Sequence, residues 1–267
     1  METPSAPSSN ARVIIAFLCL FVVLMALSAS AYFAGDLGKL QERLSARESQ
    51  AALQGITEPA QIEEALKQHP SNKLVQMMAM ATTAANETNA AIENLSNEIE
   101  PPAISKADNL GTAKRNELEA LRRDLKTAEA NATAFLPRYV SVLKSERDNV
   151  EKYALSLHLG KDTVGRLLDD VDKRHAEITA LASRMLAARA EYYRTYEAYV
   201  AVLVREFGAY KVVNGEFIFP FQPTVNRYNA AADAMTVAAR RVTDLQEERK
   251  SQLQAQQERW LQLVNGN

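Results

Sequence analysis

The sequence contains little cysteine, glycine or proline, and it has no marked excess of either charge. Its 267 residues include one cysteine, nine glycines and nine prolines, and 31 basic against 33 acidic side chains leave a net charge of -2. A single cysteine excludes a disulfide within the chain. The balanced charge offers no basic field for nucleic acid. Scarce helix breakers, with abundant Ala, Leu, Glu, Gln and Arg, favour helices throughout.

The sequence also has no recognisable catalytic or metal-binding motif. No nucleophile elbow, phosphate-binding glycine loop or cysteine–histidine cluster is present. His175 follows Asp172 by three positions, but di-metal bundles place Glu-x-x-His on each of two helices. We interpret His175 as a core or edge residue. We expect no catalytic residue, metal or cofactor, and a protein that is not an enzyme.

Residues 13–35 form an uncharged, mainly apolar run that follows a short tail at residues 1–12. As a helix this run is about 34 Å long, enough to cross a hydrocarbon core of about 30 Å. It predicts a single-pass anchor that contacts the lipid bilayer. Ala29-Ser30-Ala31 has the small-x-small pattern of a signal peptidase site, so the run also fits a signal peptide. We favour an uncleaved anchor because the apolar character continues beyond this site.

The orientation of the anchor has two readings. Arg12 precedes the run while Lys39, Arg43 and Arg47 follow it, and this bias favours a cytoplasmic domain. A short tail, one span and a large trailing domain are instead the usual layout of an exported protein, and the Ala29-Ser30-Ala31 site agrees with it. We expect an inner-membrane protein of a bacterium with its bulk in the periplasm, and keep the cytoplasmic orientation as the alternative.

Residues 36–70 are expected to form a stalk and a linker. Gly55, Pro59 and Pro70 interrupt the helical pattern around one short helix. From Ser71 onward, apolar residues recur at alternating spacings of four and three, which is typical of amphipathic helices. The first long helix ends at Pro101-Pro102.

Three further helices follow from the same spacing. The second carries Leu118 to Leu157, with a kink or short break expected at Pro137. The third runs from an Asp162 cap to Gly208, and the last begins near Pro223. Helices with a single apolar stripe must bury that stripe against one another. Residues 71–267 are therefore expected to form an all-α, elongated antiparallel bundle or coiled coil.

Residues 209–220 interrupt this pattern with one β-hairpin. Asn214-Gly215 lies between β-forming residues, and both turn positions require a positive φ that these two residues tolerate. A two-residue turn pairs Val213 with Glu216, Val212 with Phe217 and Lys211 with Ile218. One face should then be apolar and the other mixed. The apolar face comprises Tyr210, Val212, Phe217 and Phe219, and the mixed face comprises Lys211, Val213, Glu216 and Ile218.

Two apolar groups are candidates for binding. Tyr192, Tyr196 and Tyr199 form an aromatic band near the hairpin, with Tyr193 expected to face water. The band either packs in the core or, with the hairpin face, lines a pocket for a small ligand or peptide. At the other end, Trp260, Leu261 and Val264 follow a polar stretch at 246–259 that we expect to extend beyond the core. These three residues are expected either to contact a partner or to fold back on a neighbouring helix.

A resemblance bears on the location of the protein. The segment Val213-Asn214-Gly215-Glu216-Phe217-Ile218-Phe219-Pro220, followed by Gln222 and Tyr228-Asn229, resembles the carboxy-terminal part of an uncharacterised family of bacterial helix-rich envelope lipoproteins. The similarity covers mainly residues 210–240. The chain departs from the family in lacking a lipid-attachment cysteine. Its one cysteine, Cys19, follows Leu18, whereas lipid attachment requires a small residue before the cysteine. The resemblance implies an envelope location.

Two classes of function remain. The first is a membrane-anchored helical structural or interaction protein that binds another protein or itself. The second is a sensor-type bundle that binds a ligand and acts through a separate signalling partner. A sensor usually has a second span and an output domain, and the sequence shows neither. We therefore expect the first class.

Overall fold

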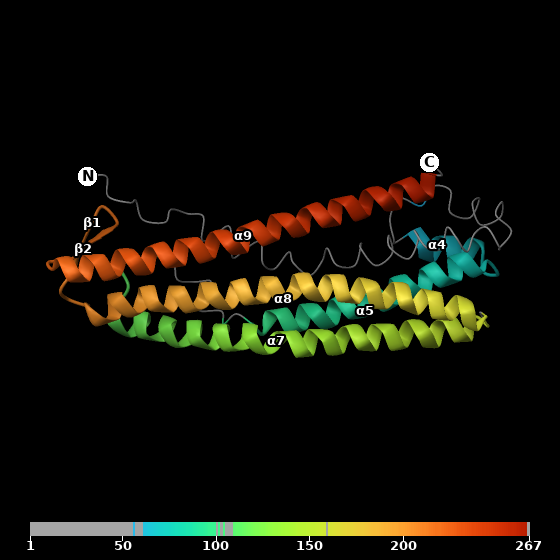
Figure 1. Ribbon diagram of the computed structural model, residues 1–267, viewed down its shortest axis with the longest axis horizontal. Coiled ribbons are helices and arrows are strands. Elements are labelled where there is room, and N and C mark those ends of the chain that lie inside the picture. The colour runs from blue at the N-terminus through green and yellow to red at the C-terminus, as the bar shows by residue number, and fades with distance from the viewer. Residues whose placement is uncertain are drawn as a thin grey trace. The chain divides into compact units, whose positions relative to one another are not determined.

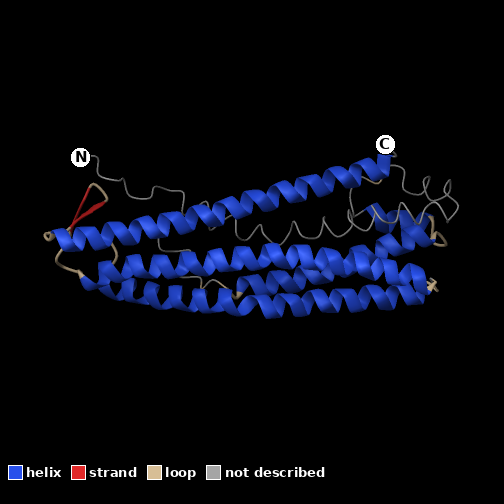
Figure 2. Cartoon of the chain, viewed as in Figure 1, coloured by secondary structure: helices blue, strands red, loops and turns tan. Residues whose placement is uncertain are grey.

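The computed structural model describes residue 56, residues 61–99, residues 101 and 104, and residues 109–158 and 160–265. In this part of the chain nearly all residues are helical, and one small hairpin is the exception (Figure 2). The helices are α4 (Gln61–Gln68), α5 (Lys73–Asn97), α7 (Arg115–Ser156), α8 (Lys161–Arg205) and α9 (Gln222–Asn265). In sequence, the hairpin strands β1 (Lys211–Val213) and β2 (Glu216–Ile218) follow α8 and precede α9, and Figure 1 shows the hairpin beside the start of α9. The predictions of a helical bundle and of one hairpin are confirmed.

Several helix ends have a clear local cause. The Asn72 side-chain oxygen accepts a hydrogen bond from the Val75 amide at 3.2 Å and caps the start of α5. The Glu117 carboxylate reaches back to accept from the Lys114 amide at 2.8 Å at the start of α7. Gly208, three residues after α8 ends, has a φ of 86°. Glycine adopts this left-handed conformation without steric cost, as the sequence predicted for this stop.

Two expectations about helix ends were wrong in detail, and of the kink or short break expected at Pro137 the break does not occur. Asp162 does not precede α8 as a cap, because the helix begins at Lys161 and the Gly160 carbonyl accepts from the Val164 amide at 3.0 Å. The sequence predicts a glycine stop for the second helix at Gly160, but the helix ends at Ser156, and His158 two residues later takes the left-handed conformation (φ 54°). No break occurs at Pro137, which lies inside α7. Phe135 and Tyr139 on either side of it are 4% and 1% exposed, so packing holds this turn in place.

The chain divides into two compact units. The hairpin unit includes Leu95–Pro137 and Ala182–Glu247, and the α4 unit includes the described parts of residues 20–94, 138–181 and 248–267. In the hairpin unit, the first part of α7 runs antiparallel to the second part of α8. Arg122 donates to Glu197 at 2.7 Å across this pair. The fully buried residues here include Leu118, Leu125, Val200 and Leu203.

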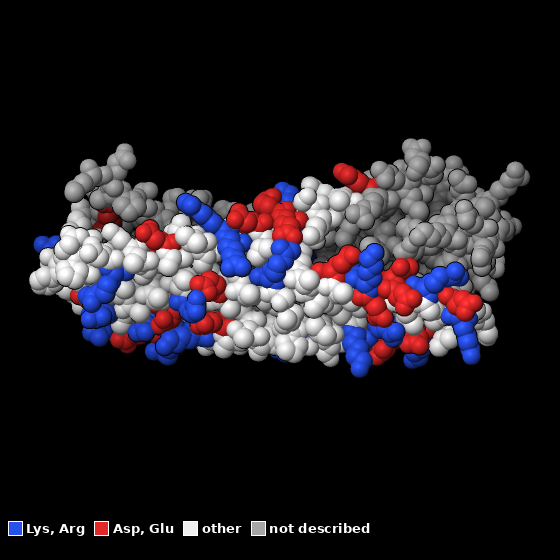
Figure 3. Space-filling view, viewed as in Figure 1, with Lys and Arg blue, Asp and Glu red and all other residues white. Residues whose placement is uncertain are grey.

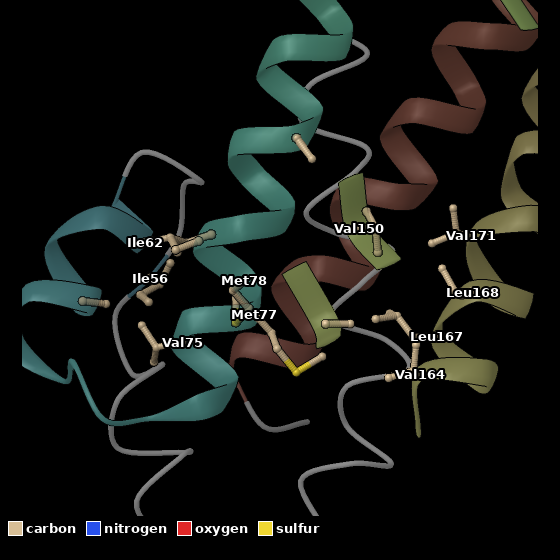
Figure 4. Close-up of a cluster of buried hydrophobic side chains, with 14 residues drawn as sticks. Ile56, Ile62, Val75, Met77, Met78, Val150, Val164, Leu167, Leu168 and Val171 are labelled. Atoms are coloured by element: carbon tan, nitrogen blue, oxygen red, sulfur yellow. The ribbon is translucent and has the colours of Figure 1, made fainter. Parts of the chain in front are cut away.

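The α4 unit has its own apolar core, drawn in Figure 4. Ile62 from α4 and Val75 and Met78 from α5 belong to the same buried cluster as Val150 of α7. The other labelled members of this cluster are Ile56, Met77 and, from α8, Val164, Leu167, Leu168 and Val171. Ile62 is fully buried, so the short helix expected within the 36–70 linker shares a core with helices that follow residue 70.

None of the described helices is both long and apolar enough to span a bilayer. The expected tail at 1–12, the expected anchor at 13–35 and the expected stalk to residue 55 lie outside the described residues.

Candidate functional site

The hairpin has the geometry that the sequence predicts. Asn214 and Gly215 have φ angles of 54° and 84°, as a type I′ turn requires at both central positions. The strands pair antiparallel with Lys211 opposite Ile218, Val212 opposite Phe217 and Val213 opposite Glu216. The predicted register is therefore confirmed. A one-residue slip would have exchanged the two faces of the hairpin.

Aromatic rings cover the inner face of the hairpin. Tyr210 lies edge-on to Phe217 and Phe219, with ring centroids 5.1 and 5.6 Å away. Tyr228 of α9 lies 5.8 Å from Phe217 and 5.0 Å from Phe219. We call these four rings the aromatic base. Aromatic pairs at such separations add favourable energy beyond the area that they bury, so the base fixes the hairpin to α9.

The predicted aromatic band on α8 continues this base. The Tyr199 ring lies 5.2 Å from Tyr228, and the two hydroxyl oxygens are 3.0 Å apart. Tyr196 lies 6.5 Å from Tyr199, and Tyr192 lies 5.9 Å from Tyr196. The structure thus brings Tyr192, Tyr196 and Tyr199 into one series with Tyr210, Phe217 and Phe219. Tyr199 is buried and Tyr192 and Tyr196 are half-buried, so the choice between core packing and a pocket stays a prediction.

The phenols of this series are held in their neutral form. Burial raises the pKa of Tyr196 and of Tyr199, and the hydrogen bond to Tyr228 raises that of Tyr199 further. Burial also raises the pKa of Tyr228, against a smaller opposite effect of the same hydrogen bond. These hydroxyls can therefore exchange hydrogen bonds near neutral pH, but they do not act as bases there.

The burial of Tyr193 was predicted wrongly, and Tyr228 was not identified from the sequence as part of this site. Tyr193, expected to face water, is fully buried, and its hydroxyl accepts a hydrogen bond from Arg189 at 2.7 Å. The reason is that α8 has neighbours on more than one side. Tyr228 was named only in the segment that carries the resemblance, yet its ring connects the band to the hairpin. Its position five residues after Pro223, at the first turns of α9, was the available signal.

Val212 behaves differently from the other members of its predicted face. It is 37% exposed and does not belong to the aromatic base. A methyl group added at Gly111 would lie 3.1 Å from Cγ1 of Val212, so the loop before α7 packs closely against this side chain. Val212 therefore lies beside the 109–112 loop while Phe217, its partner across the strands, contacts the rings.

The outer face of the hairpin is exposed to solvent. Lys211, Val213, Glu216 and Ile218 are all exposed, and exposure reaches 47% for Val213 and 52% for Ile218. Phe207 and Phe221, on either side of the hairpin in sequence, are 38% and 65% exposed. In the space-filling view the end of the hairpin unit beside the start of α9 is mostly uncharged, while charges of both signs lie along the helices (Figure 3).

His175 of the α4 unit lies beside a buried carboxylate. His175 Nε2 lies 3.2 Å from a Glu146 carboxylate oxygen, and both side chains are largely buried. Asp172, three residues earlier, instead accepts from Arg147 at 2.8 Å. Among the described residues no group of three His, Cys, Asp or Glu side chains is placed to hold a metal. His175 is a core-edge residue, as the sequence predicts.

Within the stretch 246–259, Arg249 is buried, whereas the other described side chains are exposed or half-buried. Arg249, in the stretch expected to extend beyond the core, is only 8% exposed. Burial lowers the pKa of its guanidinium to about 10, and an electrostatic interaction with the Tyr139 phenol opposes this effect. The long apolar stem of arginine can be buried while its head group finds polar neighbours. The side chains of Trp260, Leu261 and Val264 lie outside the described residues, so their role as a contact stays a prediction.

Comparison with protein-family models, with curated proteins and with solved structures found no match for this chain.

Proposed function

We propose that this chain is a membrane-anchored helical interaction protein of the bacterial envelope, which binds a protein partner through the outer face of its hairpin. Residues 13–35 would provide the anchor, and the bulk of the chain would lie in the periplasm. The uncharged run and the resemblance over residues 210–240 support this location. The proposed activity is binding, and no catalytic step is part of it.

The concentration of exposed apolar side chains at the hairpin supports the proposal most directly. In the described part of the chain, the large apolar side chains that are exposed are Val140, Leu155, Phe207, Val212, Val213, Ile218, Phe221 and Val237. Five of these eight lie in the segment from Phe207 to Phe221, and two of the five, Val213 and Ile218, share the outer face of the hairpin; the other three of the eight are scattered over α7 and α9. Contiguous exposed apolar surface is uncommon on soluble domains and marks interaction sites.

The aromatic base explains how such a surface can persist. A two-stranded hairpin is marginally stable in water when it stands alone. Here Phe219 is only 8% exposed and its ring contacts Tyr228 of α9. The inner face thus anchors the hairpin while Val213 and Ile218 remain exposed on the outer face. A surface that is already ordered binds with a smaller loss of conformational entropy.

The binding surface can be tested by photocrosslinking in native membranes. A photoreactive amino acid at Ile218 should give a discrete adduct with a protein, because this side chain would lie in the interface. The same amino acid at Val237, which is 66% exposed on α9, is the matched control and should give none. Equal labelling at both positions, or no adduct at Ile218, would show that the hairpin is not a binding surface.

The location can be tested independently of the binding surface. Alkaline phosphatase fused after Asn267 should be active if the bulk of the chain is periplasmic, and a green fluorescent protein fusion at the same site should be dark when exported in the unfolded state. The reverse result would place the hairpin in the cytoplasm and contradict the proposed location.

A further inference from the structure

We infer that the outer face of the hairpin binds the same face of a second copy of this chain. This inference rests on the proposed function and names the partner. It follows from the arrangement of four exposed side chains, Lys211, Val213, Glu216 and Ile218, which we call the outer face.

The outer face is a nearly square array with its apolar and charged groups on opposite diagonals. Val213 lies across from Glu216, and Lys211 lies across from Ile218. Neighbours across the strands are about 5 Å apart, and alternate residues along a strand are about 7 Å apart. Val213 and Ile218 therefore occupy one diagonal, and Lys211 and Glu216 occupy the other.

This arrangement is self-complementary. Two such faces can stack about a two-fold axis that runs along the Val213–Ile218 diagonal. Rotation about this axis places Val213 opposite Val213 of the second copy and Ile218 opposite Ile218. It also interchanges the positions of Lys211 and Glu216. Lys211 then meets Glu216 of the second copy, and Glu216 meets its Lys211. Two-fold pairs are the commonest form of protein self-assembly, and their interfaces use one patch twice.

The angle at which the two hairpins would cross is close to one that packed sheets adopt in proteins. An axis along this diagonal makes the strands of the two hairpins cross at roughly 70°, which is near the orthogonal class of sheet packing. Neither Lys211 nor Glu216 forms an ion pair with another residue that the structure describes. Both charges are therefore available to a second copy.

The contact would be limited to the outer face, because the exposed ring of Phe207 lies 6.1 Å from Tyr210 of the inner face. A patch of four side chains is smaller than the roughly 800 Å² per partner of a standard interface. The association should therefore be weak in dilute solution. It should depend on the raised local concentration that membrane anchoring gives.

Crosslinking of the full-length protein in membranes tests the contact. In a Cys19→Ser background, Val213→Cys places one thiol on the two-fold axis of each copy. Stacked sheets lie about 10 Å apart, which is too far for a disulfide. A short bis-maleimide should therefore be used. We expect several-fold more crosslinked dimer from Val213→Cys than from Val237→Cys, and equal yields would overturn the inference.

Charge exchange tests the symmetry. Lys211→Glu and Glu216→Lys should each reduce the Val213→Cys crosslink several-fold, because each places like charges opposite each other. When the two variants are co-expressed with different tags, the mixed dimer has opposite charges at both corners and its yield should recover. Recovery requires that both variants fold, so the mixture is its own control. If circular dichroism shows that both variants are folded and the mixture is still as weak as the single variants, the two-fold arrangement is excluded.

The inference and the proposed function can fail separately. A photoadduct from Ile218 whose mass corresponds to a different protein would leave the binding surface in place and overturn self-association. A photoadduct whose mass corresponds to two copies of this chain would support both.

Discussion

The hydroxyl oxygens of Tyr199 and Tyr228 lie 3.0 Å apart and join α8 to α9 beneath the hairpin. Because the pKa of each phenol is raised, both stay protonated at neutral pH. One hydroxyl therefore donates a hydrogen bond to the other. The hairpin follows α8 and precedes α9 directly, so this bond fixes the two helix ends that carry it.

Removing this hydrogen bond should lower stability modestly. Tyr199→Phe keeps the ring and deletes the hydroxyl, and the expected loss in the free energy of unfolding is about 1 kcal/mol. Tyr228→Phe should cost a similar amount. Because both substitutions break the same bond, the double variant should cost less than their sum. Urea unfolding of the four proteins measures this, and strict additivity would show that the two hydroxyls do not interact.

Two glycine-to-alanine changes should have opposite effects. Gly215 has a φ of 84°, so Gly215→Ala should destabilise the turn by about 1 kcal/mol. Gly165 lies inside α8, and a methyl group added there would have no neighbour within 4 Å. Gly165→Ala should therefore stabilise that helix by about 0.5–1 kcal/mol. Hydrogen exchange at residues 211–218 and thermal unfolding report these effects, and a loss of stability at Gly165 would contradict the reasoning.

Replacing a core leucine by alanine should lower the free energy of unfolding much more than replacing a surface leucine. Leu118 is fully buried in the hairpin unit, and Leu118→Ala should reduce the free energy of unfolding by about 2–5 kcal/mol. Leu155 is 55% exposed on α7, and Leu155→Ala should change it by less than about 0.5 kcal/mol. Denaturant unfolding of the two variants compares them directly. Similar losses would mean that Leu155 is covered in solution.

Two polar pairs between α7 and α8 should contribute unequally to the stability of the protein. His175→Ala removes a partner from Glu146, whose side chain is 6% exposed, and should cost about 3 kcal/mol. Asp172→Ala breaks the Arg147 ion pair, in which both side chains are at least 32% exposed, and should cost no more than about 1 kcal/mol. Thermal unfolding at neutral pH measures both. A larger loss at Asp172 would reverse this ranking.

The hairpin was predictable in detail because its signal is local. Asn214 and Gly215 are among the few residues that tolerate positive φ, and a two-residue turn leaves one register. That register then determined which side chains share a face. The same local rules found the stop at Gly208 and the start of the last helix near Pro223, since α9 begins at Gln222.

The wrong expectations arose where contacts between distant segments decide the outcome. Tyr193 lies about 100° around the helix from Tyr192, so a single stripe cannot include both. It is buried because α8 packs on more than one side, and periodicity in one helix does not reveal this. Arg249 is similar: in sequence it belongs to a polar stretch, yet it lies in a core with Tyr139, more than a hundred residues earlier. No local pattern encodes such a pairing.

The antiparallel pairing of α7 with α8 has a consequence for the folding rate. Its contacts are close in sequence near the connecting turn and become more distant away from it. Asp172 lies 25 positions from Arg147, His175 lies 29 from Glu146, and Glu197 lies 75 from Arg122. Loop closure costs more entropy as the separation grows, so the pair should nucleate at its turn and zip toward its open end. Substitutions near Lys161 should then slow folding, whereas those near Arg122 should mainly speed unfolding.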